Sequence, residues 1–322
     1  MNLLVTGGCG FIGCNFIRHI LRAHEDWKVL NLDKFTYAGR LENTRDFADN
    51  PRYKFVKGDI CDKRLVHKIM EDFDPDAVVH FAAESHVDRS ISDPTPFLES
   101  NVRGTCVLLD ATLENEVDKF IQISTDEVYG SIKSGSFKET DRLEPNSPYS
   151  ASKAAAEMFA RAYFVTYGLP VVITRSSNNY GPYQFPEKII PLFITNLVRG
   201  LKVPVYGTGL NVRDWLYVED NCEAIDLVLQ KGKPGEIYNI GGGEERTNLE
   251  LTKMLLKYLG KSEDHIEFVE DRKGHDFRYS LDCTKINKEL GWKPKTSLEK
   301  GLKLTVDWYL KNEWWWKPLI TT

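Results

Sequence analysis

Three glycines near the start of the chain constrain its fold more than any other feature. Gly7, Gly10 and Gly13 are spaced Gly-x-x-Gly-x-x-Gly. They follow the apolar run Leu3–Thr6 and open the amphipathic stretch Phe11–Ala23. Glycine allows a sharp turn and a close approach between a strand and the next helix. The chain is therefore expected to begin with a strand, a tight turn and a helix.

The rest of the first half alternates strand and helix patterns in the same way. Short runs rich in Val, Ile, Leu or Phe predict strands, and the amphipathic stretches between them predict helices. Because the strand runs are apolar throughout, they are typical of strands covered on both faces. This rhythm predicts an α/β fold with a Rossmann-like, doubly wound parallel sheet. The predicted strands are Leu3–Thr6, Lys28–Leu32, Tyr53–Lys57, Ala77–Phe81, Phe120–Ser124 and Val171–Arg175, and the predicted helices are Phe11–Ala23, Leu65–Asp72, Asn101–Glu114 and Tyr149–Tyr167.

After Asn178 the alternation breaks, which predicts a second unit. Residues 187–200, 248–260 and 297–312 have helical patterns, and residues 204–206 and 236–240 have strand patterns. We expect a sheet domain over 1–177, to which 211–243 returns, and a smaller, interleaved C-terminal lobe over 178–210 and 244–322. The aromatic run Trp314–Trp316 is expected to pack onto the body of the protein rather than contact a ligand.

Composition excludes several classes of function. A net charge of −5 argues against nucleic acid as the main partner, because nucleic-acid binding usually needs a basic face. No apolar run approaches the roughly 20 residues that span a bilayer, and the N-terminus shows no basic leader, so neither a membrane segment nor a signal peptide is expected. The six cysteines are scattered without a Cys-x-x-Cys spacing, which favours reduced thiols in the cytoplasm. No metal site is expected.

The glycine loop and the ends of the predicted strands indicate a dinucleotide site. The helix that follows the loop offers free N–H groups and a favourable dipole to a pyrophosphate. Asp33, at the end of the second strand, is placed to accept a hydrogen bond from a ribose 2′-hydroxyl, which favours NAD over NADP; the adjacent Lys34 leaves NADP open. Asp59 either binds adenine or caps the next helix. Further cofactor contacts are expected from Phe11, Ile12, Thr36, Ile60, Ala82, Ala83, Ser100, Tyr149, Lys153 and Asn179.

Two clusters of polar residues carry the candidate chemistry. Tyr149 and Lys153 are four residues apart, so they share one face of a predicted helix. Thr125, Asp126 and Glu127 stand where the fifth predicted strand ends. Neighbouring residues of a strand point to opposite faces. Both carboxyl groups can therefore reach one ligand only if the chain has already turned at Asp126.

With the glycine loop, these clusters resemble the extended short-chain dehydrogenase/reductase family, and within it the dTDP-glucose 4,6-dehydratases. The Asp126-Glu127 pair is the most specific feature, because the related 4-epimerases do not carry it there. Cys9 and Cys14 depart slightly from the pattern, since small residues are usual at those positions. The resemblance also covers the segments Ala82–Asp88, Ser177–Pro182, Pro186–Lys188, Arg213–Trp215 and Gly274–Tyr279.

The resemblance implies dehydration of dTDP-glucose to its 4-keto-6-deoxy product with NAD, for deoxysugar biosynthesis. Tyr149 would act as the base at the sugar 4-hydroxyl, and Lys153 would lower the pKa of that tyrosine, which is near 10 in the free side chain. Glu127 would remove the hydrogen from carbon 5. Asp126 would protonate the departing 6-hydroxyl, which requires a raised pKa, and Thr125 would hold the 4-hydroxyl.

The resemblance also implies the substrate contacts and the assembly. Ser85 and Asn178 would bind the hexose, and subunits would pair as a homodimer through helices 101–115 and 149–167. Candidates for the diphosphate and the rest of the substrate are Lys188, Arg213, Arg278, Asn248, Pro204, Tyr206 and His275. The alternatives are a UDP-glucose 4,6-dehydratase, a sugar-nucleotide 4-epimerase and a non-catalytic dinucleotide sensor. The sensor fits poorly, because all four residues with catalytic character are intact.

Overall fold

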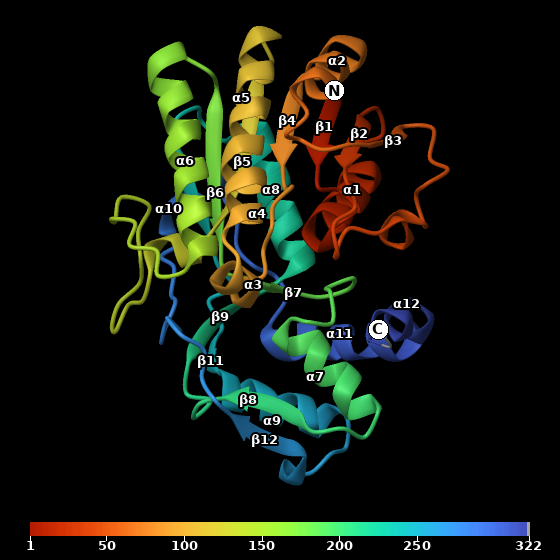
Figure 1. Cartoon of the computed structure of the whole chain (residues 1–322), viewed down its shortest axis with the longest axis vertical. Helices are drawn as coiled ribbons and strands as arrows, with labels where there is room; N and C mark the ends of the chain where they lie inside the picture. Colours follow the sequence, from red (N-terminus) through yellow and green to blue (C-terminus); the bar gives the residue numbers. More distant parts are fainter. Residues whose placement is uncertain (321–322) are drawn as a thin grey trace.

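A parallel sheet forms the upper part of the molecule in Figure 1, and a smaller lobe lies below it. The structure is a computed structural model, and it describes residues 1–320. Within these residues the sheet has seven strands in the order β10-β6-β5-β4-β1-β2-β3, and every neighbouring pair is parallel. This confirms the predicted doubly wound fold. The strands are β1 (Asn2–Thr6), β2 (Lys28–Asp33), β3 (Tyr53–Lys57), β4 (Ala77–His80), β5 (Lys119–Thr125), β6 (Val171–Ser176) and β10 (Ile237–Ile240).

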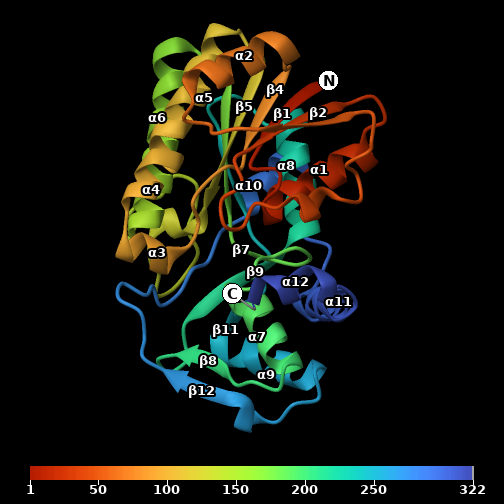
Figure 2. The ribbon, with the colours of Figure 1, turned by 45° about the vertical axis from the view of Figure 1, so that its right-hand side comes forward.

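Helices cover both faces of this sheet, as Figures 1 and 2 show. The side chains of β1 alternate between the faces: Leu3 and Val5 join a core with α1 and α8, whereas Leu4 joins a core with α2, α5 and α6. The helices of this domain are α1 (Phe11–Ala23), α2 (Lys63–Phe73), α3 (Val87–Ser92), α4 (Thr95–Phe97), α5 (Gly104–Glu114), α6 (Pro148–Tyr167), α8 (Val218–Lys231) and α10 (Thr284–Leu290), with the single-turn helices η1 (Leu41–Thr44) and η3 (Asp126–Tyr129) and the π-helix η2 (Leu98–Arg103).

The smaller lobe has its own apolar core. Phe193, Leu255 and Leu302 are buried there between helices and two small sheets, β11-β9-β7 and β12-β8. The chain then passes from β9 directly into α8, which returns to the main sheet. The elements of the lobe are β7 (Asn178–Tyr180), α7 (Ile189–Val198), β8 (Val203–Tyr206), β9 (Val212–Tyr217), β11 (Glu245–Thr247), α9 (Asn248–Tyr258), η4 (Glu263–His265), β12 (Ile266–Val269), α11 (Leu298–Lys311) and α12 (Glu313–Ile320).

The aromatic run near the end of the chain lies in α12 and packs onto the body. Trp315 and Trp316 are buried, whereas Trp314 is 47% exposed. The prediction that this run packs onto the body is therefore confirmed for two of its three residues. No helix among residues 1–320 has the length and apolar character needed to cross a membrane.

Candidate active site

The chain turns at the carboxyl end of β5, where the two acids lie. β5 ends at Thr125, and Asp126 to Tyr129 form the single-turn helix η3. The Thr125 hydroxyl caps this turn by accepting a hydrogen bond from the Glu127 N–H at 3.2 Å, and it donates to Asp126 Oδ1 at 3.2 Å. The turn that the sequence analysis required is therefore present, and it frees the two carboxyl groups from strand alternation.

Both acids lie in surroundings that favour their neutral forms. Asp126 is only 2% exposed, and its Oδ2 has no hydrogen-bond partner among residues 1–320. Burial, followed by the charges of Glu127 and Asp214, raises the pKa of Asp126 well above its ordinary value. Burial also raises the pKa of Glu127, against the opposing charges of Lys188 and Arg213. A protonated Asp126 next to a carboxylate at Glu127 is the arrangement expected of an acid and base pair.

Tyr149 and Lys153 lie on the first turns of α6. This helix begins with a capping box between Ser147 and Ser150, with Pro148 in the first turn. The Lys153 ammonium donates to the Ile123 carbonyl of β5 at 2.6 Å, and burial lowers its pKa to about 8. The catalytic helix is therefore tied to the strand that carries the acids.

In the protein without ligands, the pKa of Tyr149 is shifted in the direction opposite to the one expected from the sequence. Burial raises it, the charges of Glu127 and Asp126 act in the same direction, and only hydrogen bonding with Thr125 opposes them. The role of Lys153 in lowering the Tyr149 pKa stays a prediction. Thr125, the hydrogen-bond partner of the phenol, also caps the turn that carries both carboxyl groups.

A first cavity, with a volume of about 230 Å³, lies at the glycine loop. Glycine is required here: a Cβ on Gly7 would lie 2.6 Å from the Ala82 nitrogen, and one on Gly13 would lie 2.3 Å from the Gly7 oxygen. α1 begins beside this cavity, and Gly10, its N-cap, offers no side chain to cap the first-turn N–H groups. The predicted residues that line it are Gly7, Gly10, Phe11, Ile12, Gly13, Asp33, Lys34, Thr36, Ile60, Ala82, Ala83, Ser85, Ser100, Tyr149, Lys153 and Lys188.

Asp33 is held at the mouth of the glycine loop. Its carboxylate accepts from the Cys9 N–H at 2.9 Å and the Phe35 N–H at 2.8 Å. The Lys34 ammonium pairs with Asp59 at 3.1 Å, so its charge is already balanced by a carboxylate. Asp59 itself accepts from the Cys61 N–H and does not line the cavity. Asp59 is a loop acid but not the cap of the next helix, because Asp62 caps α2 by accepting from the Leu65 N–H at 3.0 Å.

The second cavity lies between the sheet domain and the smaller lobe and has a volume of about 190 Å³. It adjoins the first cavity, because Gln184, Glu187 and Lys188 line both. The Lys188 ammonium donates to the Ser85 carbonyl at 2.8 Å, and burial lowers its pKa. The predicted residues that line the second cavity are Glu127, Asn178, Asn179, Lys188, Pro204, Tyr206, Arg213, Asn248 and His275.

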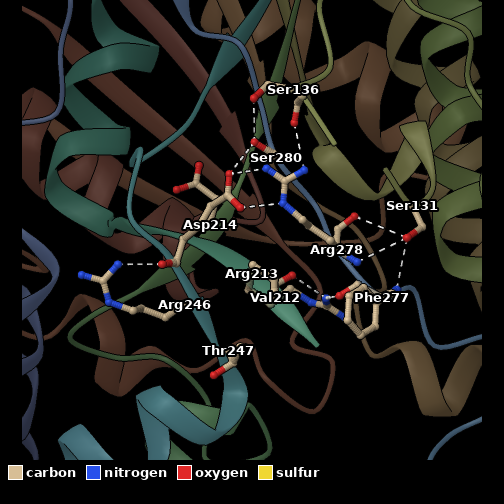
Figure 3. Close-up of polar contacts among 12 residues, drawn as sticks. Ser131, Ser136, Val212, Arg213, Asp214, Arg246, Thr247, Phe277, Arg278 and Ser280 are labelled. Atoms are coloured by element: carbon tan, nitrogen blue, oxygen red, sulfur yellow. Dashed lines mark hydrogen bonds and ion pairs between the residues drawn. The ribbon is translucent and has the colours of Figure 1, made fainter. Parts of the chain in front are cut away.

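Arg213 and Arg278, two predicted contacts of the diphosphate, have different surroundings. Arg213 lines the second cavity, donates to the Val212 and Asp276 carbonyls at 2.7 and 2.9 Å, and stacks on Tyr279. Figure 3 shows Arg278 pointing to a carboxylate instead. Its guanidinium makes two 2.7 Å hydrogen bonds to Glu245 and a third to the Gly135 carbonyl. Arg278 therefore lies outside both cavities, because Glu245 satisfies its charge.

Three further predicted residues are placed differently from expectation. Asn179, predicted for the cofactor, lines the second cavity rather than the first. Thr125 and Asp126 line neither cavity, although Glu127 lines the second. The two acids therefore differ in access, because Asp126 lies beneath the surface that Glu127 presents.

Several residues that line the cavities were not identified from the sequence. The Tyr37 phenol lies beside Glu187, and burial together with that carboxylate raises its pKa. Glu187 could have been found, because it directly precedes Lys188 in a segment that carries the resemblance. Tyr37 lies in irregular chain and gave no signal. The unpredicted lining residues with polar or aromatic side chains are Tyr37, Phe81, Glu84, His86, Asp88, Ser124, Ser147, Gln184, Phe185, Glu187, Phe193, Trp215, Arg272, Asp276 and Tyr279.

Comparison with known proteins identifies the family. The family model described as GDP-mannose 4,6 dehydratase matches residues 4–305. The chain belongs to this family. It is 55% identical to the dTDP-glucose 4,6-dehydratase of Streptomyces antibioticus, over 99% of this chain and 95% of that protein. The resemblance to the extended short-chain dehydrogenase/reductases seen in the sequence is confirmed.

Solved structures of the family have the same fold. DesIV, a dTDP-glucose 4,6-dehydratase from Streptomyces venezuelae determined with NAD and TYD bound, is 54% identical and superimposes with a TM-score of 0.97, over 99% of this chain and 100% of that one. The UDP-glucose 4-epimerase of Thermotoga maritima is 34% identical with a TM-score of 0.91, over 97% of this chain and 100% of that one. The similarity is thus greater to the dehydratase than to the epimerase.

Proposed function

We propose that this chain is an NAD-dependent dTDP-glucose 4,6-dehydratase, a lyase of deoxysugar biosynthesis. One observation carries the proposal: η3 holds a buried acid, Asp126, and a partly buried acid, Glu127, in the turn capped by Thr125, which is also the hydrogen-bond partner of the Tyr149 phenol. A 4-epimerase needs one base at carbon 4, whereas removing water across carbons 5 and 6 needs a further base and a further acid. Two relatives that share more than half of the sequence, the Streptomyces antibioticus enzyme and DesIV, are described as dehydratases of this kind, which supports the same function.

The first cavity fits NAD. The glycine loop leaves room for a pyrophosphate where a Cβ would clash, and the uncapped first turn of α1 supplies N–H donors. Asp33 would bind the adenosine ribose, and pairing of Lys34 with Asp59 removes the cation that would favour a 2′-phosphate. When bound, NAD accepts the hydride from carbon 4 and returns it to carbon 6, so the reaction has no net redox change. We assign residues 1–177 and 218–243 to this cofactor-binding unit, because β9 (Val212–Tyr217) pairs with β7 and β11 of the smaller lobe and not with the main sheet.

The remaining steps are proton transfers by side chains of this chain. Tyr149 takes the proton of the sugar 4-hydroxyl. The positive charge of a bound oxidised cofactor would favour this transfer, because it opposes the negative charges of the nearby acids. The ketone formed at carbon 4 acidifies the hydrogen on carbon 5, which Glu127 removes. Asp126, whose pKa is raised by burial and by the charge of Glu127, gives its proton to the departing 6-hydroxyl as water leaves. The proton on Glu127 returns to carbon 5, so the proton taken by Tyr149 balances the one given by Asp126.

The second cavity would hold the nucleotide diphosphate and the sugar. Lys188 is placed for the diphosphate, because it lines both cavities. Arg213 is a second candidate, with part of its donor capacity used by carbonyl groups. Asn178 has a buried Oδ1 without a partner among residues 1–320, so a sugar hydroxyl could donate to it. We assign 178–217 and 244–322 to this lobe, except for α10 (Thr284–Leu290), whose Ile286 packs in the core of the sheet domain.

We further propose a homodimer in the cytoplasm. The exposed side of α6 carries several large apolar side chains, which is typical of a protein interface. Met158 is 48% exposed, Phe159 44%, Val165 62% and Tyr167 59%. All six cysteines are free thiols, which supports a reducing compartment.

Parallel incubation with dTDP-glucose and UDP-glucose tests the activity. The expected result is a 4-keto-6-deoxy product, detected by its absorbance in alkali, at a higher rate from dTDP-glucose. Product from UDP-glucose alone would indicate the UDP-specific dehydratase. Interconversion of glucose and galactose nucleotides without the keto product would indicate a 4-epimerase and overturn the proposal.

A further inference from the structure

The side chain of Asn43, in η1, donates a hydrogen bond to the backbone of the glycine loop. The Cys9 N–H donates to the Asp33 carboxylate at 2.9 Å. On its other side, the Cys9 carbonyl accepts from the Arg40 N–H at 3.0 Å and from Asn43 Nδ2 at 2.7 Å. Cys9 lies between Gly7 and Gly10, so these hydrogen bonds fix the path of the loop. The orientation of the Asn43 amide therefore affects the shape of the cofactor site.

Trp315 of α12 sets that orientation. Its indole Nε1 donates to Asn43 Oδ1 at 2.7 Å. An indole N–H can only donate, so it requires the carbonyl oxygen of the amide to face it. The NH₂ group of Asn43 must then face the Cys9 carbonyl. Asn43 and Trp315 are each 1% exposed, so water cannot readily replace either contact.

Aromatic packing keeps Trp315 rigid. Its ring lies 5.2 Å from that of Trp308, 5.7 Å from Tyr183 and 6.2 Å from Tyr309. The Tyr309 hydroxyl in turn donates to the carbonyl of Gln184, a residue that lines both cavities. This aromatic cluster of Tyr183, Trp308, Tyr309 and Trp315 therefore links the smaller lobe to the glycine loop and to the junction between the cavities.

We propose that Trp315 is a positioning residue for the dinucleotide: through Asn43 and the Cys9 carbonyl, its indole N–H holds the glycine loop in the form that binds the pyrophosphate. The inference rests on the proposed NAD site. Without the indole donor the Asn43 amide can rotate, and an amide turned the other way presents an oxygen to the Cys9 carbonyl. The Cys9 carbonyl then keeps only one of its two donors, the Arg40 N–H, and the cofactor itself must order the loop, which weakens binding.

Three conservative substitutions on one helix test this inference. Trp315→Phe removes the N–H but keeps an aromatic ring. Trp316→Phe makes the same change at a buried tryptophan whose Nε1 donates to the Tyr309 carbonyl at 2.8 Å and does not reach the glycine loop. Trp314→Phe makes it at the exposed position, where Nε1 donates to Asn312 at 3.1 Å. NAD affinity of the stripped full chain is measured by calorimetry, with the thermal midpoint recorded alongside.

Trp315→Phe is expected to weaken NAD binding about tenfold, the effect of losing roughly one net hydrogen bond. Amide hydrogen exchange in residues 7–13 should become faster in the same variant. Trp316→Phe should lower the thermal midpoint about as much as Trp315→Phe does, but it should leave NAD affinity within about twofold of that of the parent. Trp314→Phe should change neither the thermal midpoint nor the NAD affinity. Unchanged affinity in Trp315→Phe, or an equal loss in Trp316→Phe, overturns the inference alone. Failure of the parent chain to bind NAD overturns both this inference and the proposed function.

Discussion

Asp126 is a buried acid that does not make all of its possible hydrogen bonds. Such a group lowers the stability of the fold, so we expect it only where the acid has a function. One oxygen accepts from Thr125, and the other has no partner among residues 1–320. An unpaired polar atom of this kind normally destabilises a folded protein. The neighbouring charge of Glu127 adds to that penalty. Such strain at one residue is expected where an acid must hold its proton at neutral pH.

Asp126→Asn should therefore stabilise the protein while removing its activity. The folded pKa of Asp126 lies above the unfolded value, which is near 3.9, so in that interval the folded state binds more protons and its stability falls as pH rises. Asparagine does not titrate. The free energy of unfolding of the variant should exceed that of the parent by an amount that grows as pH rises above about 4. Urea unfolding across pH, with the exposed Asp49→Asn as control, measures this; equal pH dependence in variant and parent would contradict it.

Glu127→Gln should separate the oxidation step from the loss of water. The amide keeps the shape of Glu127 but cannot accept the proton from carbon 5. Dehydration is expected to fall by about 10²–10⁴-fold, the range for loss of a general base. Reduced cofactor should still form on mixing with dTDP-glucose, because Tyr149 and Lys153 are untouched. Rapid-mixing absorbance follows the cofactor, and product analysis follows dehydration. Dehydration at the parent rate would remove Glu127 from this role.

At the scale of elements, the sequence predicted the regular parts well. β3 and α1 have the predicted bounds, because apolar runs and amphipathic periodicity are local signals. β9 and α8 were not predicted as elements, because Arg213, Asp214 and Glu219 give their sequence the polar character of a loop. Most of β9 is nevertheless buried. Their burial comes from tertiary contacts, such as the two N–H donors to the Asp214 carboxylate, from Gly242 and Glu244.

The candidate site was predictable to a similar extent. Residues at strand ends or in the glycine loop line the cavities, because parallel topology brings strand ends together. Arg278 could not be placed, because its partner Glu245 is distant in sequence and an arginine takes whichever carboxylate geometry allows. The turn at Asp126 was required by the chemistry but not predicted by local residues. It depends on Thr125 as a cap and on contacts that hold Tyr129.

A buried ion pair holds η3 against the catalytic helix. Arg175 on β6 pairs with Glu157 on α6 at 2.6 Å, and both are almost fully buried. The same guanidinium donates to the Tyr129 hydroxyl of η3 at 2.7 Å and stacks on its ring. Glu157 lies one turn beyond Lys153, so one cation connects the helix of the tyrosine base to the turn of the two acids.

A double-mutant cycle on this pair should show strong coupling. Arg175→Met leaves the Glu157 charge buried and unpaired, which should destabilise the protein by about 3–5 kcal/mol. Adding Glu157→Leu removes that charge, so the double variant should recover most of the loss, with a coupling energy of at least about 2 kcal/mol. Urea unfolding of the four proteins measures the cycle. Additive losses would mean that Arg175 acts through packing rather than charge.

At the scale of the whole molecule, the two lobes depend on each other. The smaller lobe carries Arg213, Asn248 and most of the second cavity, and the sheet domain carries the proton-transferring residues. The cavities meet at Gln184, Glu187 and Lys188, in the segment that joins the lobes. Neither lobe alone therefore provides a complete site, so substrate must bind across the junction.

The exposed apolar side of α6 should be the contact between two copies of the chain. Phe159→Glu places a charge in the centre of this surface and should convert a dimer to a monomer, because burying an unpaired carboxylate opposes association. Leu304→Glu on α11 is the matched control, since Leu304 is 42% exposed and Phe159 44%. Light scattering after size exclusion measures the mass of each protein. Tyr149 and Lys153 lie on the same helix as Phe159, so a monomeric variant should also lose part of its activity through a less rigid α6. A Phe159→Glu protein that remains dimeric, or a parent chain that is monomeric, would contradict the assignment of this face.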